Sequence, residues 1–188
     1  NASGVAVLLE LARSLAAFPL MRPVHLVAFD LEEYGLHGST HYAERLHQQK
    51  QPLAVALSLE MLGYCSSEPN SQKYPAFLRY LYPTCGDFIG AIGNWASIPA
   101  MIRLHRAMRS QSVKCQWLVV GQRGKLLPDT RRSDHSPFWD RGYPAVMVTD
   151  TANLRNPHYH KASDRLETLD LDFLTGVCRG LIRGVPQI

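Results

Sequence analysis

Short apolar segments that alternate with segments of helical periodicity constrain the fold of this chain most strongly. Near-continuous apolar runs occupy residues 23–30 (PVHLVAFD) and 52–63 (PLAVALSLEMLG), and a run of helical spacing lies between them at 38–49. Two further strand candidates follow, KCQWLVVG and YPAVMVTD. Strands that are apolar on both faces and alternate with helices are typical of a mainly parallel sheet. We therefore predict an α/β fold in which helices cover both sides of the sheet.

Helices are also predicted at both ends of the chain. Residues 1–18 begin with a capping residue, Asn1 or Ser3, and carry an apolar stripe at helical period. The stripe consists of Val7, Leu8, Leu11, Leu15 and Phe18. Residues 87–110 show mostly helical spacing, and a last helix is predicted at about 171–184.

The bulk properties suit one folded domain. The chain has 188 residues, and its formal net charge of +4 comes from scattered cations without the interleaved aromatic residues of a nucleic-acid platform. No apolar run approaches the roughly 20 residues that a membrane-spanning helix needs, so we expect no membrane span. Cys65 and Cys85 flank a loop-like segment, 64–86, and could form a disulfide in an oxidising compartment.

The start of the chain indicates truncation. The sequence begins with NASGVAVLLELARSLAAF, which has no initiator methionine and lies directly on a helix-start pattern. A domain rarely begins on the first turn of a core helix. We therefore expect sheet strands and any targeting signal to lie in a preceding segment. The compartment consequently stays open, and a secreted or periplasmic location is compatible with the sequence. A bare sheet edge would favour association into a homo-oligomer.

Two adjacent glutamates, Glu32 and Glu33, follow the apolar run at 23–30 and precede Gly35. Adjacent residues in a strand point to opposite faces, so the two side chains share a site only if the backbone turns, as Gly35 allows. Two carboxylates at one place repel each other, and a divalent cation removes that cost. We interpret one as a metal ligand and the other as the base for metal-bound water. The alternative is that both acids begin a helix.

Glu60 and His160 favour the metal interpretation. Glu60 ends the second apolar run, and His160 lies in the polar loop after the last predicted strand. The carboxyl ends of strands are where α/β sheets bind ligands. Carboxylate oxygen and imidazole nitrogen are both zinc ligands, and catalytic zinc usually keeps about three protein ligands and one open position.

Other combinations of metal-binding or catalytic residue types are weaker. His37 and His41 have the spacing of a helical metal-binding pair, but Gly38 replaces the glutamate of H-E-x-x-H. Asp134 and His135 follow a serine, and neighbours in sequence do not form a hydrolase triad. We expect these two residues to orient their loop behind the site.

Five segments match one known family in order along nearly the whole chain: NASGVAVLLELAR, VAFDLEEYGLHGSTHYA, SLEMLGY, SDHSPFWDRGYPAVMVTD and NPHYHKASDRLETLD. On these segments the chain resembles the M28-type zinc exopeptidases, a family of aminopeptidases. The resemblance implies a three-layer α/β/α sandwich with a mixed, mainly parallel central sheet. It also implies that residues 1–188 form a single, incomplete peptidase catalytic domain that lacks its N-terminal strands.

The resemblance assigns roles residue by residue. Glu32 is similar to the general base of the family, and Glu33 and His160 to ligands of one zinc ion. Glu60 falls at the acidic ligand of the second zinc ion. Tyr159 matches a tyrosine that steadies the oxyanion in some members. The implied reaction is attack of zinc-bound hydroxide on the first peptide bond of a substrate whose free N-terminus lies in an acidic pocket.

Two family ligands have no counterpart in the chain: a histidine on an earlier strand and an aspartate that bridges both metals and would precede Asn1. The resemblance therefore implies an aminopeptidase with two zinc ions when intact, whereas these 188 residues alone would bind at most one and be nearly inactive. Two alternatives remain open. One is glutaminyl cyclisation with a single zinc, and the other is a non-catalytic binding domain of the same fold.

Overall fold

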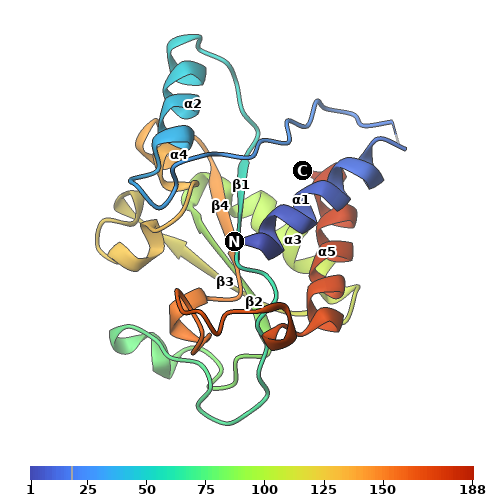
Figure 1. Cartoon of the computed structure of the whole chain (residues 1–188). Coiled ribbons are helices and arrows are strands. Elements are labelled where there is room, and N and C mark those ends of the chain that lie inside the picture. The colour runs from blue at the N-terminus through green and yellow to red at the C-terminus, as the bar shows by residue number, and fades with distance from the viewer. Residues whose placement is uncertain (18) are drawn as a thin grey trace.

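A mixed four-stranded sheet forms the centre of the computed structural model, which describes residues 1–17 and 19–188 (Figure 1). The strands are β1 (Ala56–Glu60), β2 (Phe88–Asn94), β3 (Lys114–Val120) and β4 (Ala145–Thr149). Their order across the sheet is β1-β4-β2-β3. β1 runs parallel to β4, and β2 runs parallel to β3, whereas β2 and β4 are antiparallel. The prediction of a mixed α/β sheet is therefore confirmed.

Helices cover both faces of this sheet, as predicted (Figure 1). One layer contains α1 (Ala2–Leu15), α3 (Ile98–Arg109) and α5 (Leu171–Gly184), and the other contains α2 (His37–Gln48) and α4 (Ser136–Asp140). Short 3₁₀ turns lie at Ala76–Tyr80, Trp95–Ser97, Gln122–Gly124, Pro128–Arg131, Ala152–Leu154, Leu166–Thr168 and Val185–Gln187. None of the helices in the described part of the chain has the length and apolarity that crossing a bilayer requires.

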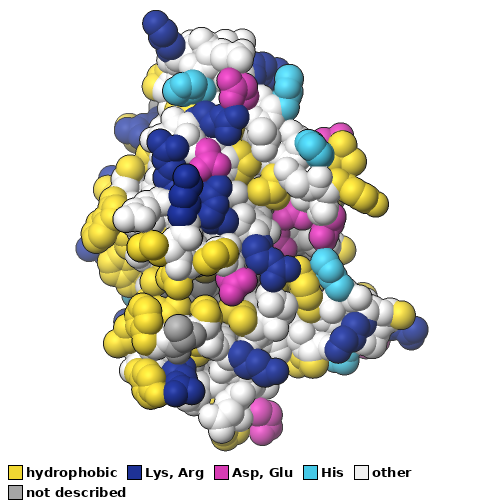
Figure 2. Space-filling view, turned by 90° about the vertical axis from the view of Figure 1, so that its left-hand side faces the viewer, with side chains coloured by type: hydrophobic (Ala, Val, Ile, Leu, Met, Phe, Trp, Pro, Cys, Tyr) yellow, Lys and Arg dark blue, Asp and Glu magenta, His cyan; other side chains and the backbone are white. Residues whose placement is uncertain are grey.

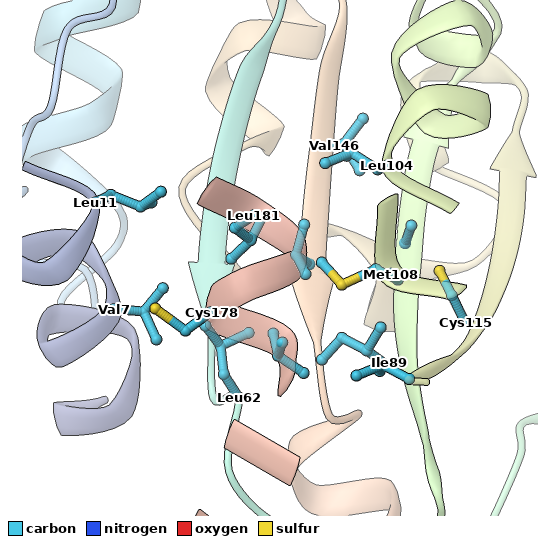
Figure 3. Packing of buried hydrophobic residues seen from close by; sticks show 14 of the residues in the cluster. Val7, Leu11, Leu62, Ile89, Leu104, Met108, Cys115, Val146, Cys178 and Leu181 are labelled. Carbon is cyan, nitrogen blue, oxygen red and sulfur yellow. The ribbon is translucent and has the colours of Figure 1, made fainter. Parts of the chain in front are cut away.

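Two apolar clusters, one on each face, hold the layers together. In the larger cluster, residues from α1, α3 and α5 pack on the strands, and Leu181, Val177 and Ile89 are completely buried (Figure 3). The smaller cluster joins α2 and α4 to the opposite face around Phe138 and Trp139. Burial of a large apolar side chain contributes about 1.5–3 kcal/mol, so these layers fix the strand ends that carry the polar groups.

The first helix forms as its sequence predicts. Asn1 is the N-cap, and its side chain accepts a hydrogen bond from the backbone N–H of Gly4 at 3.2 Å. Three members of the predicted stripe, Val7, Leu11 and Leu15, are buried. Leu8 is half-buried, and the fifth member, Phe18, lies outside the described residues.

The prediction of a strand at residues 23–30 is wrong. This segment belongs to no strand, and among the described residues no backbone hydrogen bond joins residues 23–29 to another segment. Its side chains are exposed or half-buried, with Leu26 38% exposed. A strand needs a partner at about 4.8 Å, and here an open cavity of about 740 Å³ lies between this segment and β1. We call this cavity the slot; its lining includes Val24, Leu26, Leu57 and Leu59.

The helical prediction for residues 87–110 is wrong in its first part, because residues 88–94 form β2 rather than a helix. Most of this strand is buried, so its sequence has no polar face from which a period of two residues could be read. Gly93 leaves room for α3, because a Cβ atom there would lie 2.6 Å from the sulfur of Met101. The second part forms α3 with Pro99 in its first turn, as predicted.

Candidate metal and catalytic site

The chain turns sharply directly after the two adjacent glutamates. The carbonyl of Glu32 accepts hydrogen bonds from the N–H groups of Gly35 and Leu36, at 3.2 and 3.0 Å. Gly35 has a φ of +109°, a value that side chains other than hydrogen rarely allow, and Leu36 and Leu31 also have positive φ. Both glutamates lie among the residues that line the slot.

Glu33 and His160 meet, although 127 residues separate them in sequence. Glu33 Oε1 lies 3.2 Å from His160 Nε2, and both side chains are more than half exposed, at 66% and 54%. Two ligands that each lie about 2.0–2.1 Å from one tetrahedral zinc ion are about 3.3 Å apart. The observed separation therefore fits a shared ion as well as a direct contact.

Glu60 lies at the end of β1, where a serine holds its carboxylate. Ser133 Oγ donates a hydrogen bond to Glu60 Oε2 at 2.9 Å, and it lies 2.7 Å from Ser58 Oγ on the same strand. Burial raises the pKa of Glu60, and the bond from Ser133 opposes this rise. The sequence analysis did not assign a role to Ser133. Its position directly before Asp134 and His135, two candidate site residues, was the available signal.

Glu32 is a carboxyl whose ionisation the site disfavours. Burial, followed by the negative charges of Glu60 and Asp134, raises its pKa to about 7. Near neutral pH this carboxyl therefore exchanges its proton readily. A group in that state suits general acid–base chemistry.

Tyr159 lies beside His160 at the same site. The two rings stack with centroids 4.0 Å apart and an interplanar angle of 15°. Burial raises the pKa of the Tyr159 hydroxyl, with Arg132 opposing and Glu33 adding to the rise. The hydroxyl consequently stays protonated at neutral pH and remains a hydrogen-bond donor. Arg132 Nη2 lies 3.4 Å from its oxygen.

Asp134 and His135 occupy different environments. The Asp134 Oδ1 atom is buried and has no hydrogen-bond partner in the described part of the chain. His135 is completely buried, donates from Nε2 to the carbonyl of Thr130 at 2.7 Å and packs edge-on against Trp139. Burial lowers the pKa of His135 to about 4, so the ring is neutral.

The described residues include no group of three or more His, Cys, Asp or Glu side chains close enough to hold a metal ion. The structure thus brings Glu33 and His160 into contact and places Glu32 and Glu60 near them, but it does not form a complete metal cage. His37 and His41 lie at a separate pocket with Asp30 and Tyr42. Figure 2 shows acidic side chains gathered at one edge of this view, with histidine and basic side chains beside them.

Glu60 at the end of β1, together with Glu32, Glu33 and His160 in loops, supplies side chains of the types found in metal-dependent α/β enzymes. The comparison with protein families makes this specific. The model of Peptidase family M28 matches residues 1–183, and the chain belongs to this family.

Three known proteins illustrate the similarity. An uncharacterized protein of Escherichia coli (strain K12), YfbL, is 37% identical over 185 residues, which are 97% of this chain and 57% of YfbL. A probable zinc metalloprotease of Pyrenophora tritici-repentis is 28% identical over 94% of this chain and 40% of its own length. The crystal structure of the Legionella pneumophila LapA aminopeptidase has the same fold, with a TM-score of 0.72, 19% identity, and coverage of 98% of this chain and 44% of LapA.

These relatives are longer than the chain. It spans about half the length of the relatives it matches. Shorter matches also carry the name aminopeptidase, among them YwaD of Bacillus subtilis, which is 39% identical over 75 residues, or 39% of this chain and 16% of YwaD.

Proposed function

We propose that the protein containing this chain is a zinc-dependent aminopeptidase that releases N-terminal amino acids from peptides. The contact between Glu33 and His160 is the observation on which the proposal depends most, because it joins two zinc-ligand types from distant segments at 3.2 Å. Membership of family M28 and relatives named aminopeptidase support the reaction class. The free N-terminus of a substrate is cationic, and the surrounding carboxylates attract it.

Glu33, His160 and Glu60 are the proposed zinc ligands. Their oxygen and nitrogen atoms match the ligands that zinc prefers. When bound, zinc supplies Lewis acidity, which polarises a carbonyl group and lowers the pKa of water.

Glu32 is the proposed general base. Its carboxylate adjoins the proposed ligand Glu33 and lies near Glu60, where it can accept a proton from the attacking water and pass it to the leaving amine. Tyr159 is the proposed oxyanion donor, because its hydroxyl remains protonated and lies at the same site.

Residues beyond these 188 are proposed to complete the site. The family resemblance calls for a further histidine and a bridging aspartate, and the described residues hold no group of three metal ligands. We expect a polypeptide of these 188 residues to be inactive or nearly so. The free edge of β1 at the slot further supports association of two such polypeptides.

The experiment is hydrolysis of a leucine anilide by the complete natural protein, with and without a chelator. The expected result is release of leucine that the chelator abolishes, that the Glu33→Gln variant lacks and that the surface variant Glu68→Gln retains. A protein that cleaves neither this substrate nor unblocked peptides would overturn the proposal. Cyclisation of a peptide with N-terminal glutamine, measured in the same samples, would assign the cyclase reaction instead.

A further inference from the structure

An exposed arginine, Arg132, lies beside the acidic site. Arg132 directly precedes Ser133, whose hydrogen bond to Glu60 fixes this part of the loop at the end of β1. The Arg132 side chain reaches Tyr159, with Nη2 3.4 Å from the tyrosine oxygen and the guanidinium carbon 6.0 Å from the ring centre. A positive charge therefore lies beside the proposed oxyanion donor.

Arg131 and Arg141 are engaged by carboxylates, whereas the described contact of Arg132 is with the Tyr159 side chain. Arg131 donates to the carbonyl of Arg123 at 2.6 Å and to the carboxylate of Asp140 at 2.7 Å. Arg141 forms an ion pair with Glu44 at 2.5 Å. In the described part of the chain Arg132 has no ion pair, it is exposed, and its contact with Tyr159 is long. Most of its five N–H donors thus remain free for a ligand.

The contacts also order the groups along the site. Glu33 contacts His160, His160 stacks on Tyr159, and Tyr159 contacts Arg132. A substrate amine attracted by the glutamates, with its first carbonyl at Tyr159, would have its second residue at Arg132.

We propose that Arg132 binds a carboxylate on the residue that follows the scissile bond, so that the enzyme prefers dipeptides or peptides with an acidic second residue. This inference rests on the proposed aminopeptidase function. A guanidinium binds a carboxylate through two parallel hydrogen bonds. The acids of the site would repel a substrate carboxylate. Arg132 would offset that repulsion where the second residue lies.

The test compares matched substrates with the complete natural protein loaded with zinc. Leu-Gly and Leu-Gly-amide differ in the terminal carboxylate, and Leu-Asp-amide and Leu-Asn-amide differ in the side-chain carboxylate. The wild type is expected to favour the charged member of at least one pair about 10- to 100-fold in kcat/KM, mostly through KM, as charge-assisted hydrogen bonds of this kind provide. The pair that shows the preference identifies the source of the carboxylate.

Variants separate recognition from a structural role. Arg132→Met is expected to abolish the preference while it leaves the neutral substrates within about twofold, Arg132→Lys to restore part of it, and the surface control Arg109→Met to retain all of it. A wild type without preference would overturn the inference while the proposed function stands. An equal loss on all four substrates in Arg132→Met would overturn it as well, because Arg132 would then only position Tyr159. A wild type that cleaves none of the substrates would refute both proposals.

Discussion

Replacing Glu32 with glutamine removes a carboxyl group that the fold makes costly to ionise. In the unfolded chain this group ionises near its ordinary pKa of 4.5, whereas in the folded protein its pKa is about 7. Between these values the folded state holds a proton that the unfolded state has lost. The free energy of unfolding therefore falls as pH rises through this window, and it is unaffected by Glu32 below 4.5.

The magnitude follows from the two pKa values. At about 1.4 kcal/mol per pH unit the difference corresponds to about 3 kcal/mol. Glu32 is partly exposed, so solvent screening reduces this to about 1–2 kcal/mol. Relative to the wild type, Glu32→Gln should gain this amount of stability between pH 4 and pH 8.

Urea unfolding of the metal-free protein at pH 4, 6 and 8 measures the effect. The control is Glu68→Gln, which removes one exposed carboxylate in a loop far along the chain from the site. Its difference from the wild type should stay constant within about 0.5 kcal/mol. A Glu32→Gln difference that is also constant, or that shrinks as pH rises, would contradict a Glu32 pKa raised by burial and by the neighbouring acids.

Three further predictions concern the scaffold. Trp139→Ala should lower the free energy of unfolding by about 3–5 kcal/mol in chemical denaturation, because the ring is 1% exposed and donates to the carbonyl of Ala145; a loss below 1 kcal/mol would contradict the packing. The pKa of His135 is lowered to about 4, so the free energy of unfolding of the wild type should fall by up to about 3 kcal/mol relative to His135→Gln as pH falls from 6.5 to 4. A pH-independent difference between the two proteins would contradict the burial of His135 as a neutral ring. A polypeptide of these 188 residues should associate and bind a hydrophobic dye at the slot, and a dye-silent monomer in light scattering would count against an open edge.

Sequence reasoning predicts the elements whose periodicity is local and misses those that depend on distant partners. α5 forms at its predicted bounds, and α1 begins as predicted but ends at Leu15, three residues before the end of the predicted segment 1–18. Both could be predicted because their caps and apolar stripes lie in one continuous segment. Residues 23–30 have the composition of a strand, but a strand also requires hydrogen-bonding partners that no local pattern reveals. The buried β2 has apolar residues on both faces, which conceals its period.

The features of the candidate site also fall into those that the sequence predicts and those that it does not. The acids at strand ends and His160 could be selected from residue type and position, and the structure places Glu33 against His160. The roles that the family resemblance assigns to Glu32, Glu60, Tyr159 and His160 remain proposals. The hydrogen bond from Ser133 to Glu60 and the approach of Arg132 to Tyr159 depend on how one loop packs over the sheet, so no spacing in the sequence predicts them.

Zinc binding by the complete natural protein tests the central claim most directly. Equilibrium dialysis, with metal content read by mass spectrometry, should show stoichiometric zinc in the wild type and in Glu68→Gln. Glu33→Gln and His160→Asn should each weaken zinc binding at least about 100-fold, which exceeds the usual effect of groups that only support a ligand. Wild-type affinity in both variants, or a wild type that binds no zinc, would contradict the claim that these two side chains share one ion.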